Sequence, residues 1–205
     1  MKMAIFFYVL LSYSLAFITP GRPDPHDLPI GSDMPKSDIK MKDVSGILVS
    51  LREANTPNGL LVMFSCNTCP YVIKNQRRTR AACAFAKEKG LGVIILNANE
   101  GGRSNGESLA DMQAYAKQQS YNWYYALDSD NELADAFGAT RTPECFLFNK
   151  NGKLAYHGAI DDSPADISQV KRNHLKQAIT EMTQGSNISV KESRSIGCSI
   201  RRKGS

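Results

Sequence analysis

The sequence predicts an α/β fold with a central mixed β-sheet and helices on both of its faces. Two continuous apolar runs, 60–64 and 91–96, are typical of strands that are buried on both sides. Segments of helical composition alternate with such runs, and this alternation builds a sheet covered by helices on both faces. The dipeptide Asn151-Gly152 predicts a tight hairpin, so the sheet also contains antiparallel strands.

An apolar block near the N-terminus predicts a secretory signal. The block covers 4–18, follows Lys2, and is shorter than the roughly 20 residues that span a bilayer. The small residues Ser14 and Ala16 stand at the third and first positions before a cleavage point, so we expect residues 1–16 to be removed. The protein would then lie in the periplasm or outside the cell. The alternative is a membrane anchor that is not cleaved, which is the only membrane partner we expect.

The rest of the chain is expected to form one domain with flanking segments. Several prolines between Pro20 and Pro35 exclude regular structure and predict an extended linker over 17–35. A globular domain is expected over 36–185, followed by a basic polar tail over 186–205. The formal net charge of +5 in 205 residues is too small to indicate a nucleic-acid partner.

Local signals place the individual elements. Gly90 and Gly138 mark helix ends, because glycine readily takes the left-handed conformation that follows a helix. Asp130 and Ser163 are the expected N-caps of two later helices, and Pro164 suits a first helical turn. In chain order we predict strands at 39–41, 47–51 and 60–64, a helix at 71–89, a strand at 91–96, a helix at 108–119, a strand at 123–127, a helix at 130–137, strands at 144–149 and 154–160, and a helix at 163–184.

Cys66 and Cys69 form a Cys-x-x-Cys motif (66–69) directly after the strand predicted at 60–64. We expect this strand to deliver Cys66 to the first turn of the next helix, where free backbone N–H groups and the helix dipole favour a thiolate. Cys69 would then lie about one turn further on, close enough to form a disulfide. The motif therefore predicts redox chemistry.

A metal site is the alternative interpretation of these thiols. Zinc would need a second Cys or His pair at ligand spacing, and neither the three histidines nor Cys83, Cys145 and Cys198 form one. We therefore expect no metal and no other cofactor. Cys83 lies among alanines in a predicted helix and is expected to be a small buried apolar residue.

Pro143 stands at the start of the strand predicted at 144–149. Proline cannot donate to the sheet ladder, which places it at the first position, and X-Pro is the only bond at which a cis peptide is cheap. The sequence alone leaves the isomer open.

Together these elements resemble the thioredoxin fold, a three-layer sandwich. Within it, the stretches 66–72 (CNTCPYV) and 141–146 (RTPECF), followed by 158–162 (GAIDD), are similar to the redoxin group related to alkyl hydroperoxide reductase and thiol-specific antioxidant proteins. The resemblance covers roughly 31–184.

The resemblance implies an exported thiol–disulfide oxidoreductase. Cys66 would be the attacking thiolate and Cys69 the resolving thiol of a redox-active disulfide. Pro143 would be the cis-proline facing that disulfide, with Thr142 and Arg141 beside it in contact with an extended substrate segment. The implied partners are protein disulfides or dithiols and a redox partner that supplies or accepts electrons. The direction of exchange stays open, because the residues between the cysteines do not set the potential.

The chain departs from thioredoxins at two places. Ser65 stands where thioredoxins usually have tryptophan, and the strand at 60–64 lacks their buried aspartate. The proton acceptor for Cys69 is therefore unassigned, with Glu100 and Glu144 as weak candidates.

A thiol-dependent peroxidase is the alternative function. Peroxiredoxins resemble one another in a proline seven residues and a threonine three residues before the peroxidatic cysteine. Counting back from Cys66 gives Gly59 and Met63, and counting back from Cys69 gives Val62 and Cys66, so neither cysteine fits. A binding module in which the thiols are incidental is a third class.

The tail contains one more thiol, Cys198, in the sequence Gly-Cys-Ser-Ile, which is similar to the C-terminus of some members of the redoxin group. Two expectations follow from it. Either the tail folds back so that Cys198 exchanges with Cys66 and Cys69, or the tail is disordered and the thiol is idle.

Overall fold

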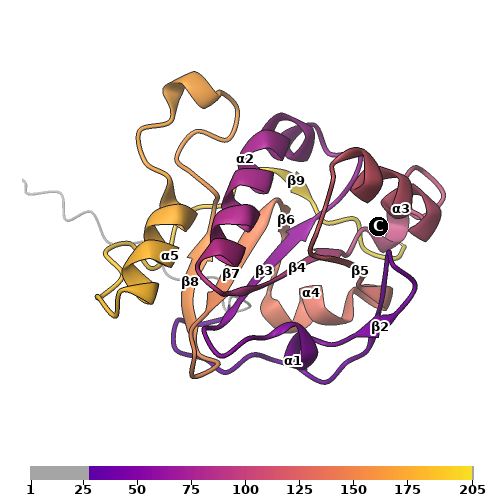
Figure 1. Cartoon of the computed structure of the whole chain (residues 1–205). Helices are drawn as coiled ribbons and strands as arrows, with labels where there is room; N and C mark the ends of the chain where they lie inside the picture. The colour runs from indigo at the N-terminus through magenta and orange to yellow at the C-terminus, as the bar shows by residue number, and fades with distance from the viewer. Residues whose placement is uncertain (1–27, 205) are drawn as a thin grey trace, which may run out of the picture.

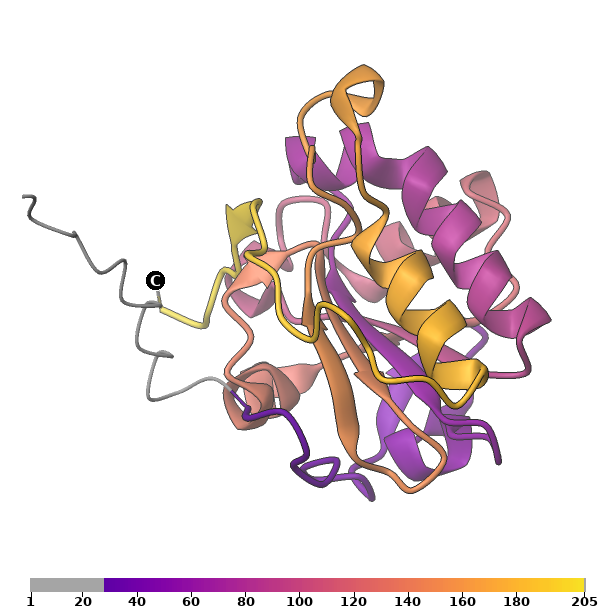
Figure 2. The same ribbon diagram turned by 90° about the vertical axis from the view of Figure 1, so that its left-hand side faces the viewer.

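Figure 1 shows the computed structural model of the protein, which describes residues 28–204. A seven-stranded sheet in the order β2-β1-β5-β4-β3-β7-β8 forms the middle layer, and helices cover both faces (Figures 1 and 2). The predicted α/β class is confirmed. The predicted signal, residues 1–16, lies outside the described residues. Within 28–204, no helix has the length and apolar character needed to cross a membrane.

The elements follow the predicted order, with a short helix after the second strand, two short strands and three 3₁₀ helices (η) added. They are β1 (Met41–Asp43), β2 (Leu48–Val49), α1 (Leu51–Ala54), β3 (Leu60–Ser65), α2 (Pro70–Glu88), β4 (Gly92–Asn97), η1 (Glu100–Gly102), α3 (Leu109–Gln118), β5 (Tyr124–Leu127), η2 (Ser129–Asn131), α4 (Glu132–Phe137), β6 (Arg141–Thr142), β7 (Glu144–Phe148), β8 (Leu154–Gly158), η3 (Ile167–Gln169), α5 (His174–Thr183) and β9 (Cys198–Ser199).

Strand β3 is the centre of the sheet. It pairs parallel with β4 and antiparallel with β7, while β4 also pairs parallel with β5. Strands β7 and β8 form the antiparallel hairpin that Asn151-Gly152 predicts. Because β3 and β4 are parallel, their carboxyl ends meet at one edge of the sheet, and the Cys-x-x-Cys motif begins at that edge.

Side chains of β3 alternate between two hydrophobic cores, as the pleat of a strand requires. Leu60, Val62 and Phe64 face the core that contains α1 and α4, here called the first core. Leu61 and Met63 face the second core, which contains α2, α3 and α5. Burial on both faces explains the continuous apolar run that marks β3 in the sequence.

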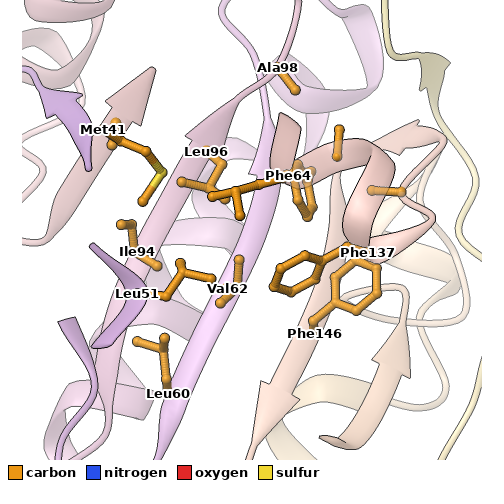
Figure 3. Close-up of a cluster of buried hydrophobic side chains, with 14 of the residues drawn as sticks. Met41, Leu51, Leu60, Val62, Phe64, Ile94, Leu96, Ala98, Phe137 and Phe146 are labelled. Atoms are coloured by element: carbon orange, nitrogen blue, oxygen red, sulfur yellow. The ribbon is translucent and has the colours of Figure 1, made fainter. Parts of the chain in front are cut away.

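Three aromatic rings in the first core hold the end of β3 (Figure 3). Phe64 lies with its ring centroid 5.4 Å from that of Phe137 in α4 and 5.7 Å from that of Phe146 in β7. The rings of Phe137 and Phe146 are 5.0 Å apart, and all three contacts are edge-to-face, the favoured geometry for aromatic pairs. This cluster fixes the backbone two residues before the motif.

The helix predicted over 163–184 begins only at His174. A buried arginine forms hydrogen bonds with carbonyl oxygens at the predicted start of the helix, those of Ser163 and Pro164. Arg78 of α2 donates to the carboxylate of Asp161 at 2.8 Å and to the carbonyl oxygen of Pro164 at 3.1 Å. These bonds keep the segment as a loop. Arg78 therefore pairs inside the protein.

The predicted N-cap of α4 was also wrong. Both carboxylate oxygens of Asp128, not Asp130, accept hydrogen bonds from the helix, at 2.9 Å from Leu133 N and 2.8 Å from Ala134 N. Asp130 points outward and pairs with Lys203. Burial raises the pKa of Asp128 to about 6.

The described part of the predicted linker packs against the domain. Leu28, Ile30 and Met34 contact the first core, and the Gly31 amide donates to the carbonyl oxygen of Leu154 at 2.8 Å. Residues of the predicted linker are therefore in contact with the domain expected over 36–185.

The tail is folded onto the domain, against the alternative of a disordered tail. Its strand β9 lies beside β6 (Figures 1 and 2), and the two form a separate two-stranded sheet. Ile200 is only 5% exposed and belongs to the first core. Upstream, the Ser193 amide donates to the carbonyl oxygen of His157 at 3.0 Å. The tail thus reaches the edge of the sheet where the motif lies.

Candidate active site at the Cys-x-x-Cys motif

The motif connects the end of β3 to the start of α2. The helix begins at Pro70, so Cys69 is its N-cap residue and Cys66 lies three residues before the cap. This corrects the prediction that Cys66 occupies the first helical turn. Proline suits the first helical position, because the N–H that it lacks would have no helical partner there. The positive end of the helix dipole therefore acts first on Cys69.

The structure brings three sulfur atoms together at this place. Cys69 forms a disulfide with Cys198 of the tail, with their Cα atoms 6.0 Å apart. Cys66 is a free thiol with no exposed surface. Its Sγ lies 3.5 Å from the hydroxyl oxygen of Thr142, and Sγ of Cys69 lies 3.5 Å from the carbonyl oxygen of the same residue. In this state Cys69 is therefore bonded to the tail and not to Cys66.

The loop opposite the sulfurs is the one predicted to bind substrate. The peptide bond between Thr142 and Pro143 is cis, as the resemblance implies. Arg141 and Thr142 form β6, which pairs antiparallel with β9 so that Arg141 faces Ser199 and Thr142 faces Cys198. Arg141 is exposed and donates to the Ser199 hydroxyl at 2.8 Å. The predicted substrate-binding residues are thus occupied by the tail.

A buried carboxylate, Glu107, lies beneath the motif and was not predicted. One oxygen accepts from the Asn67 amide at 2.9 Å and from the Asn97 side chain at 2.7 Å. The other accepts from the Thr68 amide at 3.0 Å and from its hydroxyl at 2.6 Å. All four partners are donors, which an ionised carboxylate satisfies. Glu107 therefore binds the backbone N–H groups of Asn67 and Thr68, directly after Cys66.

Further hydrogen bonds fix the same loop. The Asn67 side chain accepts from the Tyr125 hydroxyl at 2.8 Å and donates to the carbonyl oxygen of Gly106 at 2.8 Å. Arg103 donates to the carbonyl oxygen of Glu107 at 3.0 Å. The motif and the loop after β4 are therefore one hydrogen-bonded unit, and a satisfied polar network of this kind favours a single conformation.

The environment of Cys66 disfavours a thiolate. Burial and, after it, the negative charge of Glu107 raise the pKa of the Cys66 thiol to about 11, while the hydrogen bond with Thr142 acts in the opposite direction and is weaker. The prediction of a stabilised Cys66 thiolate is therefore wrong for this state. At pH 7 the group is a neutral thiol.

The reactivity of Cys66 should follow this pKa. With the tail disulfide in place Cys66 is enclosed, so we expect its alkylation by iodoacetamide to be slow at every pH. Its rate should rise about tenfold per pH unit from pH 7 and level off only near the pKa of about 11. Mass spectrometry of the alkylated peptides separates Cys66 from the other thiols. A rate that levels off at or below pH 8 would show instead that the thiolate is stabilised.

The two weak candidates for the proton acceptor have other partners. Glu144 accepts from the Arg141 amide at 2.9 Å and lies 2.8 Å from Nε2 of His157, so it supports the loop before Pro143. Glu100 pairs with Arg103.

The remaining thiols are buried in the second core. Cys83 and Cys145 have no exposed surface, and burial raises the pKa of both. The expectation that Cys83 is a buried apolar residue is confirmed. In the described part of the chain, no three His, Cys, Asp or Glu side chains are grouped so that they could hold a metal ion.

Comparison with known proteins places this site in a family. A hypothetical protein from Sinorhizobium meliloti 1021 is 28% identical, with a TM-score of 0.79 over 87% of this chain and 97% of its own. An uncharacterized conserved protein from Geobacillus kaustophilus is 29% identical, with a TM-score of 0.76 over 86% of this chain and 94% of its own. A putative thiol:disulfide interchange protein DsbE from Chlorobium tepidum shares the fold, with 20% identity and a TM-score of 0.53 over 64% of this chain and 85% of its own.

No curated protein matches the sequence. The sequence profile of the Redoxin family matches residues 29–173, which contain the motif, Glu107 and the cis-proline loop. The chain belongs to the Redoxin family.

Proposed function

We propose that the protein is an exported thiol–disulfide oxidoreductase that exchanges disulfides with protein substrates through Cys66 and Cys69. One observation carries this proposal. Both sulfurs contact Thr142, next to the cis-proline Pro143, and Cys69 already holds a disulfide to a peptide segment that pairs with this loop. Membership of the Redoxin family supports redox chemistry at the same thiols.

We assign the attack on the substrate disulfide to Cys69 and its resolution to Cys66, which reverses the roles expected from the sequence. Cys69 is the N-cap of α2, where the helix dipole stabilises a thiolate, whereas burial and Glu107 disfavour one at Cys66. The Cys69 thiolate attacks a substrate disulfide, forms a mixed disulfide and releases one substrate thiolate, which takes up a proton. Cys66 then loses its proton and attacks Sγ of Cys69. This releases the second substrate thiolate and leaves the Cys66–Cys69 disulfide.

The balance of this cycle requires a second partner. The substrate disulfide gains two electrons and the two cysteines lose them, so a dithiol reductant must restore the pair before another turnover. In the opposite direction, the Cys66–Cys69 disulfide oxidises a substrate dithiol, and the partner removes electrons. The potential of the pair decides the direction.

Backbone groups of β6 are the proposed contact for the substrate. Strand β6 has a free edge for an extended peptide when the tail leaves, and strand addition supplies main-chain hydrogen bonds for many peptide sequences. Arg141, which is exposed, adds a cation beside this edge. This arrangement suits unfolded or flexible protein segments.

Export is proposed from the apolar block at 4–18 and the small residues Ser14 and Ala16. Sequencing the N-terminus of the protein recovered from its native host tests it. A chain that begins after Ala16 supports cleavage and export. A chain that keeps residues 1–16 and sediments with membranes supports the anchored alternative.

A single-turnover assay tests the proposed chemistry. The protein is reduced, freed of reductant and mixed either with insulin or with hydrogen peroxide. We expect one equivalent of insulin disulfide to be reduced, at least about a hundredfold faster than by free cysteine, because positioned nucleophiles gain this much and more. We expect peroxide to react no faster than with free cysteine. Rapid peroxide consumption with intact insulin would contradict the proposal and favour the peroxidase alternative.

A further inference from the structure

We infer that Cys198 is a third redox-active cysteine, and that the tail segment 197–200 is a built-in substrate that occupies the peptide-binding edge at Thr142. The inference rests on the proposed function, since it names the occupant of the proposed substrate position. It assigns two alternative disulfides to Cys69, here called the tail disulfide (Cys69–Cys198) and the motif disulfide (Cys66–Cys69).

The tail binds in the way expected of an extended substrate. Strand β9 adds to β6 in antiparallel register, with Cys198 opposite Thr142, and this register places its sulfur at Cys69. The residue before the cysteine approaches the loop closely, because a Cβ atom on Gly197 would lie 2.0 Å from the carbonyl oxygen of Thr142. Only glycine fits here without movement of the backbone. The site therefore accepts an extended segment in which glycine directly precedes the reactive cysteine.

The tail is held on both sides of Cys198 without help from the disulfide. Before it, the Ser193 amide donates to the carbonyl oxygen of His157 at 3.0 Å. Beyond it, Ile200 is buried in the first core and its amide donates to the carbonyl oxygen of Thr140 at 3.0 Å. The Arg201 amide donates to the side chain of Asn99 at 2.9 Å. These contacts keep the Cys198 thiol near Cys69 after the disulfide opens, so its effective concentration there is far above that of a free thiol.

The seated tail also covers the site. Cys66 is fully buried and Cys69 is 2% exposed, while Cys198 keeps part of its surface in solvent. A substrate disulfide cannot reach Cys69 until the tail segment leaves β6. The tail and an external substrate therefore compete for one position.

The exchange between the two disulfides needs no external oxidant or reductant. Cys66 loses its proton and its thiolate attacks Sγ of Cys69. The Cys66–Cys69 bond forms, the Cys69–Cys198 bond breaks, and Cys198 leaves as a thiolate that takes up a proton. The reverse step is attack of the Cys198 thiolate on the same sulfur. Each state holds one disulfide and one thiol, so the exchange is an isomerisation.

Disulfide mapping tests this exchange. The protein is equilibrated in glutathione buffers of several potentials, quenched with acid, alkylated and digested. The tail disulfide appears as two crosslinked peptides, and the motif disulfide as an internal link within one peptide. We expect both forms in the wild-type protein. Their ratio should be the same at every glutathione potential, because both contain the same number of electrons.

A matched pair of tail variants shows whether the pairing of the tail with β6 sets the ratio of tail to motif disulfide. In Gly197→Ala the added Cβ meets the Thr142 carbonyl, and we expect the ratio of tail to motif disulfide to fall at least about tenfold, which corresponds to ~1.4 kcal/mol. Ile196→Ala is the control, because Ile196 is exposed and precedes the contact. Its ratio should equal the wild-type value. Circular dichroism confirms that both variants are folded; if Gly197→Ala is not, Ile200→Ala, which removes the buried anchor beyond Cys198, tests the same position of the tail.

Three results would overturn the inference. A wild-type protein that shows only the tail disulfide at every potential would make Cys198 a structural cysteine, and one that shows only the motif disulfide would make it idle. An unchanged ratio in a folded Gly197 variant would remove the role of the glycine. The insulin assay separates these failures from failure of the proposed function. Insulin reduction without the tail disulfide overturns only the present inference, whereas both disulfides without insulin reduction overturn the proposed function.

Discussion

Replacing Cys69 by alanine is expected to lower insulin reduction at least about a thousandfold, since no other thiol of the site stands at a helix N-terminus. The variant should also lack both the tail disulfide and the motif disulfide, because Cys69 is the sulfur that the two share. Single-turnover insulin reduction and disulfide mapping measure these effects. Cys83→Ala is the matched control, since Cys83 is a buried core thiol in the helix that Cys69 caps. It should retain insulin reduction and both disulfides.

The companion variant Cys66→Ala distinguishes the roles of the two cysteines. With Cys198 present, this variant should form the tail disulfide, because Cys198 can still attack Cys69. If Cys69 meets the substrate, the double variant Cys66→Ala/Cys198→Ala should accumulate a mixed disulfide between Cys69 and the substrate, because both thiols that could resolve it are missing. Trapping of substrate by Cys69→Ala instead, and none by the double variant, would restore the roles that the sequence suggests.

The second large effect is expected from Glu107→Gln. The amide cannot accept at both ends, so it leaves donors of Asn67 or Thr68 unsatisfied in a buried place. We expect the free energy of unfolding to fall by about 2–4 kcal/mol, from the cost of one or two unsatisfied buried groups. Urea unfolding measures this loss.

The same substitution should lower the pKa of the Cys66 thiol, because a negative charge that disfavours the thiolate is removed. The pH profile of Cys66 alkylation should therefore level off at a lower pH than in the wild-type protein. Glu100→Gln is the matched control, since Glu100 belongs to the same loop but pairs with Arg103 near the surface. It should leave the profile unchanged. A Glu107→Gln profile that moves to higher pH would contradict the electrostatic role of this carboxylate.

The sheet was largely predictable because strands that are buried on both faces consist of continuous apolar residues. The runs at 60–64 and 91–96 became β3 and β4, with every residue of both strands buried. Local signals also predicted the helix that follows the motif and the hairpin at Asn151-Gly152.

Glu107 shows why part of the site could not be predicted. Its partners at the motif are two backbone N–H groups and a hydroxyl, and amide donors leave no trace in a sequence. One topological signal was available. Parallel strands end at the same sheet edge, so an acid in the loop after β4 is expected close to residues that follow β3.

The late start of α5 and the folded tail both depend on long-range contacts. Ser163 and Pro164 have the local signature of an N-terminus, but a guanidinium from α2 binds the carbonyl groups there. The tail is polar, and a two-residue strand held by one buried isoleucine, Ile200, gives no periodic pattern. The local sequence preference determines the secondary structure only where no distant side chain forms hydrogen bonds with the same backbone groups.

Three sulfurs around one position have a simple numerical consequence. Oxidation to a disulfide joins two thiols, so one of the three cysteines always remains a free thiol. With the tail seated, the remaining thiol is Cys66, which is enclosed and protected from further oxidation. After the exchange it is Cys198, which lies closer to solvent and is open to sulfenic acid formation or to glutathione. The position of the tail thus selects which sulfur is exposed to oxidative damage.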